Sequence, residues 1–303
     1  MPDTPLATPG GAAGPARGAH ADGERGHWPW LLRVRPQQVL LATAAFLATV
    51  WAVFLAVDIV NLGGIGDSLS GPVWSGLFNR GVTEVVQWVL SALTVAAAAY
   101  LAGALAFGER RWPAAASFFF LLAIGLGLML IEEAGDVRHL IGAWVSGTFG
   151  DTILGTHHAL FAHAPVFAII AWFPVYALLR YGKHIWRVPG VRRYLVAAYS
   201  TYGVVASTAL LAHVGLFYVK LGAVIDRWVF GGRFPPEPGQ PEGLAHYFLV
   251  DSVLEESIEL IAPALMLAMV LAFARALREG TLGSERGGPG RGPSESATAA
   301  PAR

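Results

Sequence analysis

The chain has 303 residues, of which 54% are hydrophobic and only 14% are charged, and its mean hydropathy is +0.52. Soluble domains carry about 25% charged residues, so this composition excludes an ordinary water-soluble enzyme and a disordered chain. The 21 basic residues balance the 21 acidic residues, which leaves no net charge to attract nucleic acid. The sequence contains no cysteine, which excludes disulfides and thiolate metal sites. These features predict an integral membrane protein.

The two ends of the chain differ in composition from the middle. Residues 1–36 are rich in Pro, Gly, Ala and Arg without apolar periodicity, so we expect a disordered N-terminal tail. Trp28, Trp30, Arg33 and Arg35 near its end are typical of anchors at the membrane interface. Residues 280–303 return to Gly, Ser, Pro and Glu and predict a second disordered tail. Residues 37–279 are therefore the predicted transmembrane domain.

This central region contains six apolar stretches, each near the roughly 20 residues that cross a bilayer. They lie at 38–60, 83–107, 113–135, 160–181, 194–219 and 246–275. Each must be a helix, because a lipid-exposed strand edge would leave backbone groups unpaired. The predicted fold class is an all-α bundle of six transmembrane helices.

Basic residues predict the orientation of this bundle. Five of the 21 lie on one side of a six-span arrangement, and the other 16 lie in the two tails and in the loops after the second and fourth spans. The five are Arg80, Arg138, Lys220, Arg227 and Arg233. The positive-inside rule then places both termini in the cytoplasm. We expect a multi-pass protein of the cell membrane, with the lipid bilayer as partner and no nucleic acid.

Ionisable residues at membrane level are confined to the span ends that face away from the termini. A carboxylate near the bilayer centre costs roughly 2.5–3.5 kcal/mol, so it requires protonation, a partner, water or a bound cation. Acids outnumber the basic partners here, which are Arg138, Lys220 and histidines. The candidate metal-site residues are Glu132, Asp136, His139, His213, Glu255, Glu256 and Glu259. Further candidates are Glu84, Glu133, His158, His163 and Asp251.

Helical spacing groups these candidates into two sets. Glu132, Asp136 and His139 are at i, i+4 and i+7 and would share one helix face. Asp251, Glu255 and Glu259 would form a stripe on the last span. The Asp-x-x-His pair is a variant of the Glu-x-x-His pair of di-iron helix bundles. Oxygen and imidazole ligands without sulfur favour Fe, Mn or Zn, whereas the surrounding carboxylates disfavour haem.

Two segments carry a resemblance to other proteins. One is Ile131-Glu132-Glu133 followed by Asp136 and His139, and the other is the run Leu254-Glu255-Glu256-Ser257-Ile258-Glu259-Leu260-Ile261. Together they resemble uncharacterised polytopic bacterial membrane proteins. Those proteins pair an acidic doublet and a downstream His with a Glu-Glu-x-x-Glu helix near the C-terminus. The resemblance implies that the carboxylates form one site, and it implies no particular activity.

Three functions fit the sequence. The first is a divalent metal site open to the extracytoplasmic side, acting as a metal-dependent enzyme on a lipid-soluble substrate. The second is a proton- or cation-coupled transporter that uses Glu255, Glu256 and Glu259. The third is a structural or sensory membrane protein whose carboxylates only pair with Arg138, Lys220 and histidines.

Overall fold

The structure, a computed structural model, describes residues 29–79, 81–108, 112–150, 152–153, 156–212 and 216–280. Both predicted tails fall largely outside these residues. Six helical segments are long and apolar enough to cross a membrane, which confirms the six predicted spans. They are Pro36–Ile59, Val73–Phe107, Pro113–Gly135, Ala159–Trp186, Arg192–Leu211 and Gly243–Arg278. The protein is therefore a multi-pass helical membrane protein.

The helices follow one another with short connections. The long ones are α1 (Pro36–Phe54), α3 (Val82–Phe107), α4 (Pro113–Gly135), α6 (His158–Trp186), α7 (Arg192–Leu211) and α10 (Glu256–Arg278). The shorter ones are α2 (Val73–Leu77), α5 (Val137–Phe149), α8 (Phe217–Ile225) and α9 (Glu242–Phe248). Turns of π-helix occupy Leu55–Ile59, Asp226–Phe230 and Leu249–Glu255, and short 3-10 turns occupy Trp30–Arg33, Leu62–Gly64 and Gly66–Ser68. A two-residue strand pair, β1 (Thr152–Ile153) with β2 (Thr156–His157), joins α5 to α6.

Helix ends follow from local residue chemistry. Proline is the first residue of both α1 and α4, where its missing N–H removes no helical hydrogen bond. The chain leaves α4 at Gly135, and Asp136 adopts a left-handed backbone with φ of 51° before α5 begins. A left-handed residue cannot continue an α-helix, so α4 and α5 are two helices with different directions.

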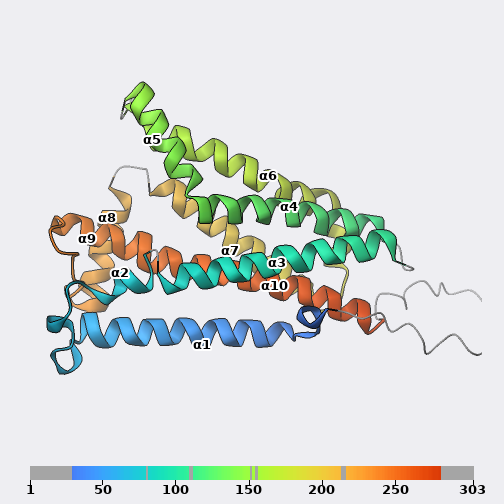
Figure 1. Cartoon of the computed structure of the whole chain (residues 1–303), viewed down its shortest axis with the longest axis horizontal. Helices are drawn as coiled ribbons and strands as arrows, with labels where there is room; N and C mark the ends of the chain where they lie inside the picture. Colours follow the sequence, from blue (N-terminus) through green and yellow to red (C-terminus); the bar gives the residue numbers. More distant parts are fainter. Residues whose placement is uncertain are drawn as a thin grey trace, which may run out of the picture.

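The bundle is arranged around α10 (Figure 1), which is the most buried of the six spans. It packs against α1, α3 and α7, while α4 packs against α3 and α6. The first turn of α1 and the last turn of α10 lie at the same end of the bundle (Figure 1). This arrangement agrees with an even number of crossings.

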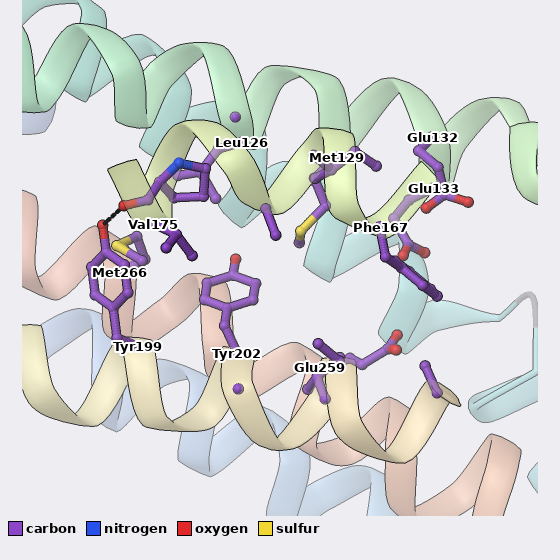
Figure 2. A pocket seen from close by; sticks show the side chains of 18 of the residues that line it. Leu126, Met129, Glu132, Glu133, Phe167, Val175, Tyr199, Tyr202, Glu259 and Met266 are labelled. Carbon is purple, nitrogen blue, oxygen red and sulfur yellow. Dashed lines mark hydrogen bonds between the residues drawn. The ribbon is translucent and has the colours of Figure 1, made fainter. Parts of the chain in front are cut away.

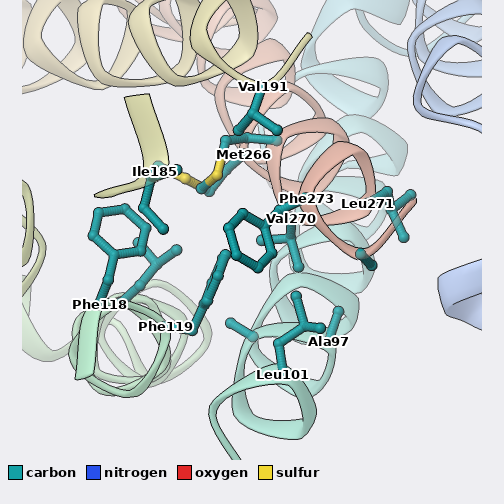
Figure 3. Close-up of a cluster of buried hydrophobic side chains, with 14 of the residues drawn as sticks. Ala97, Leu101, Phe118, Phe119, Ile185, Val191, Met266, Val270, Leu271 and Phe273 are labelled. Atoms are coloured by element: carbon teal, nitrogen blue, oxygen red, sulfur yellow. The ribbon is translucent and has the colours of Figure 1, made fainter. Parts of the chain in front are cut away.

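The half of the bundle nearest these two helix ends is packed with apolar side chains (Figure 3). Phe119 of α4 and Phe273 of α10 meet edge to face, with ring centroids 4.8 Å apart. Leu101, Ile185 and Val270 complete this core, and all are nearly inaccessible to solvent. The polar candidates therefore lie at the opposite end, as predicted.

One predicted span boundary is wrong. The fifth span was expected to run over 194–219, but α7 ends at Leu211 and a separate helix, α8, begins at Phe217. The sixth span, expected at 246–275, is confirmed at Gly243–Arg278, and within it the chain passes from α9 through a seven-residue π turn into α10. A π turn lets one helix change register without breaking, which hydropathy alone does not reveal.

Candidate functional site

A cavity of about 240 Å³ lies between α4 and α6 on one side and α7 and α10 on the other. Its walls are apolar over most of their length (Figure 2). The wall side chains include Leu126, Met129, Phe167, Ile170, Val175 and Met266. Ligand sites for drug-sized molecules usually have about 300–1,000 Å³, so this cavity suits a smaller or slender molecule.

One end of the cavity is closed by a close approach of α4, α6 and α7. The Tyr199 hydroxyl donates to the Pro174 carbonyl oxygen at 3.0 Å. A Cβ atom placed on Gly125 would lie 2.5 Å from Cδ of Pro174, so only glycine permits this contact between α4 and α6. The cavity therefore ends at the apolar half of the bundle.

The other end of the cavity is polar. It is formed by Gln87, Glu132, Glu133, Arg138 and Glu259, which come from α3, α4, α5 and α10. We call the cavity with this polar end the acidic pocket. Nε of Arg138 lies 3.4 Å from Oε1 of Glu132, and Nη2 lies 4.0 Å from Oε1 of Glu133. Gln87 Nε2 donates a long hydrogen bond, 3.5 Å, to Oε2 of Glu259.

Arg138 is surrounded by negative charge. Burial opposes its positive charge, but the carboxylates of Glu133, Glu132 and Glu259 outweigh this effect and raise the pKa of the guanidinium above its ordinary value. Its Cζ also lies 5.7 Å from the centre of the Phe167 ring, within cation–π range. Arg138 therefore stays charged and is the cation that the pocket itself supplies.

Acceptors exceed donors at this polar end. Within the described residues, Oε1 of Gln87 and Oε2 of Glu132 are buried and accept no hydrogen bond, whereas Oε1 of Glu132 is ion-paired with Arg138. Gln87 is only 2% exposed and Glu132 only 3%, so bulk water does not satisfy them. Buried polar atoms normally have partners, because an unmade hydrogen bond costs free energy. The polar end of the pocket therefore contains buried acceptors that the described residues leave without a donor.

Two of the predicted site residues lie away from the pocket. Asp136 and His139 pair with each other through Oδ1 and Nδ1, and both are exposed, at 50% and 58% of their side chains. The prediction that they share one helix face with Glu132 is wrong, because the left-handed backbone at Asp136 separates α4 from α5. The signal was Gly135 followed by Asp, a pair typical of a helix end.

The acidic residues of the last span face different partners. Oε2 and Oε1 of Glu255 accept from the hydroxyls of Tyr218, at 2.7 Å, and Thr208, at 3.2 Å. Asp251 accepts from the Tyr247 hydroxyl at 3.0 Å. Only Glu259 lines the acidic pocket. The predicted stripe of three carboxylates thus serves three separate sets of neighbours.

The remaining candidates among the described residues do not line the cavity, although Glu84 and Glu256 lie close enough to Glu133 to interact with it electrostatically. His163 is buried on α6, with its ring 5.6 Å from that of His139. Glu84 stands in the first turn of α3, and Glu256 begins α10. Lys220, a predicted charge partner, is exposed on α8. His213 and the side chain of His158 lie outside the described residues.

Within the part of the chain that the structure describes, no three His, Asp or Glu side chains gather so as to hold a metal ion. The metal interpretation of the sequence therefore gains no support from these residues. The polar end of the cavity instead brings together three carboxylates, one guanidinium and one amide, which belong to Glu132, Glu133, Glu259, Arg138 and Gln87.

Sequence reasoning missed Phe167 and Tyr202 as contributors to the pocket, and it noted Gln87 only as a polar residue at membrane level and not as a site residue. Tyr202 lies in the middle of α7, far from the interfacial belts where tyrosine is common in membrane proteins. A phenol at that depth needs a polar partner, so the position of Tyr202 in the sequence already indicated a polar site near it. Phe167 carried no signal, because an aromatic residue in an apolar span looks like ordinary packing.

No protein-family model, no curated protein and no solved structure matches this chain. The class of the protein therefore rests on its own features, which are six apolar spans and an acidic pocket between them.

Proposed function

We propose that this protein binds an amphiphilic organic cation, an amine with an apolar chain, in the acidic pocket. The observation that carries the proposal is the combination of unused buried acceptors at one end of the pocket with an apolar wall along the rest. Three carboxylates against one guanidinium leave the pocket net negative when all are ionised. A ligand with positive charge and several N–H donors supplies what the polar end lacks.

A primary ammonium group matches this inventory better than a neutral or anionic group. It carries three donors and no acceptor, so it can satisfy Gln87 Oε1 and the carboxylates of Glu132 and Glu259 together. Hydrogen bonds between charged groups are stronger than neutral ones. The apolar part of the ligand then lies along Met129, Phe167 and the wall beyond them, where it is removed from water.

The position of the pocket favours ligand access from one side of the bilayer. Its closed end meets the apolar core near the termini, and the polar end lies toward the opposite end of the bundle. With both termini in the cytoplasm, as the positive-inside rule predicts, the pocket faces the extracytoplasmic side of the cell membrane. The dry inner half offers no polar continuation, so binding is favoured over transport across the membrane.

The test is a binding measurement on the full-length chain in phosphatidylcholine nanodiscs, which contain no primary amine. Radiolabelled octylamine is equilibrated with loaded and empty nanodiscs, and unlabelled octylamine, octanol and octanoate are compared as competitors. We expect saturable binding of one octylamine per chain, displaced by octylamine but not by the other two. If octanol displaced radiolabelled octylamine as well as unlabelled octylamine does, the pocket would bind apolar chains regardless of charge, and the proposal would be overturned.

Variants locate the binding. Glu259→Gln keeps the shape of the side chain and removes its charge, and we expect a loss of affinity of about tenfold or more. The matched control is Glu279→Gln, since Glu279 is half exposed and pairs only with Arg275 at the end of α10; it should bind like the wild type. Glu133→Gln is a second pocket variant in case Glu259→Gln unfolds. Unchanged binding in both pocket variants would contradict the proposal. The proposal would also be contradicted if the purified wild-type protein held one metal ion per chain and the Glu259→Gln variant did not.

A further inference from the structure

Tyr202 places a hydroxyl group in the apolar part of the acidic pocket. Its side chain points from α7 into the space between the helices, at a level between Tyr199 and Glu259 (Figure 2). The hydroxyl oxygen is buried and has no hydrogen-bond partner within the described residues. The neighbouring Tyr199 differs, because its hydroxyl is bonded to the Pro174 carbonyl.

This unpartnered hydroxyl requires an explanation. Burial without a hydrogen bond costs free energy that a phenylalanine in the same place would avoid. A water molecule beside Tyr202 would find its other polar partners only among the carboxylates at the polar end, since the rest of the wall is formed by residues such as Leu126, Met129 and Phe167. An amine bound to those carboxylates would displace that water. The partner of Tyr202 is therefore best supplied by the ligand.

We infer that the ligand is an amino alcohol, with an oxygen function part-way along its apolar chain that hydrogen-bonds to Tyr202. Tyr202 is then the residue that selects among amphiphilic amines, whereas the acidic end selects the charge. This inference rests on the proposed function, since it assumes that an amine occupies the polar end.

Helix geometry gives the position of the oxygen. Glu259 and Met266 mark the two ends of the pocket on α10, and seven residues of helix extend about 10 Å. Tyr202 lies between these ends (Figure 2), so its hydroxyl faces the middle of the bound chain and not its far end. A hydroxyl near the middle of an eight-carbon chain therefore suits Tyr202 better than one at the end of that chain.

The experiment compares three amines on the full-length protein in phosphatidylcholine nanodiscs, namely octylamine, 5-hydroxyoctylamine and 8-hydroxyoctylamine. The two amino alcohols have the same composition and differ only in the position of the hydroxyl. We expect 5-hydroxyoctylamine to bind about three- to tenfold more tightly than 8-hydroxyoctylamine, the effect of one net hydrogen bond. In Tyr202→Phe this preference should disappear, with octylamine affinity kept or increased.

Tyr176→Phe is the control, because Tyr176 is exposed on α6 and does not line the cavity, and it should retain the preference. Equal affinities of the two amino alcohols for the wild type would overturn the inference, as would a preference that survives in Tyr202→Phe. In either case octylamine binding that still depends on Glu259 would leave the proposed function intact. Failure of all three amines to bind would end both proposals.

Discussion

Nε of Arg138 lies 3.4 Å from Oε1 of Glu132, although the two residues belong to different helices separated by the left-handed turn at Asp136. The turn brings Arg138, at the start of α5, back toward the end of α4. The guanidinium is therefore placed at the polar end of the acidic pocket, where Glu133 and Glu259 also act on it. We therefore expect both the stability of the fold and the proposed ligand binding to depend on this placement.

Removing Arg138 should destabilise the fold. In Arg138→Gln the carboxylates of Glu132 and Glu133 lose their cation, and breaking a largely buried pair costs about 3 kcal/mol. The measurement is reversible unfolding in mixed micelles. Arg138→Gln/Glu132→Gln should recover at least about 1 kcal/mol, the coupling between the two groups. Arg275→Gln removes a cation from an exposed pair and should change the free energy of unfolding by less than about 1 kcal/mol. If Arg275→Gln destabilised the protein as much as Arg138→Gln, Arg138 would have no special role in stability.

The same substitution should strengthen ligand binding. Arg138 competes with an incoming ammonium group for the pocket carboxylates, and two like charges closer than about 15 Å repel by at least about 1 kcal/mol at an effective dielectric constant near 20. We expect Arg138→Gln to bind octylamine about three- to tenfold more tightly in the nanodisc assay. Arg138→Lys keeps the charge and should not show the gain. Weaker binding in Arg138→Gln would mean that Arg138 contacts the ligand itself.

The fold was predictable where apolar length was the governing signal. The third span was predicted at 113–135, and α4 covers Pro113–Gly135. Prediction failed where the backbone changes register inside an apolar stretch, as at the π turn Leu249–Glu255. That turn contains Asp251 and Glu255 within an otherwise apolar stretch, and neither residue type indicates a π turn, so its geometry depends on packing that hydropathy does not contain.

The site was predictable in its charges but not in its shape. Glu132, Glu133, Glu259 and Arg138 were candidates because ionisable groups at membrane depth are costly. The apolar wall and the phenol of Tyr202 were not candidates, because they become informative only when a cavity separates α6 from α7. Sequence spacing also joined His139 to Glu132, and it could not anticipate that the helix ends between them.

The contact between α4 and α6 predicts opposite effects at two glycines of one helix. Gly125→Ala would put Cβ 2.5 Å from Cδ of Pro174 and force the helices apart, with an expected loss of about 1–3 kcal/mol. Gly127→Ala meets no atom within 4 Å and should be neutral or stabilise by up to about 1 kcal/mol. Unfolding in mixed micelles measures both, and equal losses would argue against the close approach. Gly125→Ala should also weaken octylamine binding, because it displaces the closed end of the pocket.

Tyr218 should support the fold without contributing to the pocket. Its hydroxyl donates to Glu255 at 2.7 Å, and Tyr218→Phe leaves that buried carboxylate oxygen without its donor. We expect a loss of about 1–3 kcal/mol in the free energy of unfolding. Octylamine affinity should be unchanged, since neither residue lines the cavity. A large change in affinity would show that Glu255 and Glu259 belong to one site after all.

The orientation of the bundle decides which compartment supplies the ligand. Because the sequence contains no cysteine, a single introduced cysteine is the only thiol in the protein, and its labelling reports the orientation. Single cysteines are introduced at Ser70, an exposed residue between α1 and α2, and at Pro189, an exposed residue between α6 and α7. These connections lie at opposite ends of the bundle (Figure 1). We expect a membrane-impermeant maleimide to label Ser70→Cys on intact cells and to label Pro189→Cys only after permeabilisation, because basic loops stay in the cytoplasm. The reverse pattern would place the acidic pocket on the cytoplasmic side, and the ligand would then have to be a cytoplasmic amine.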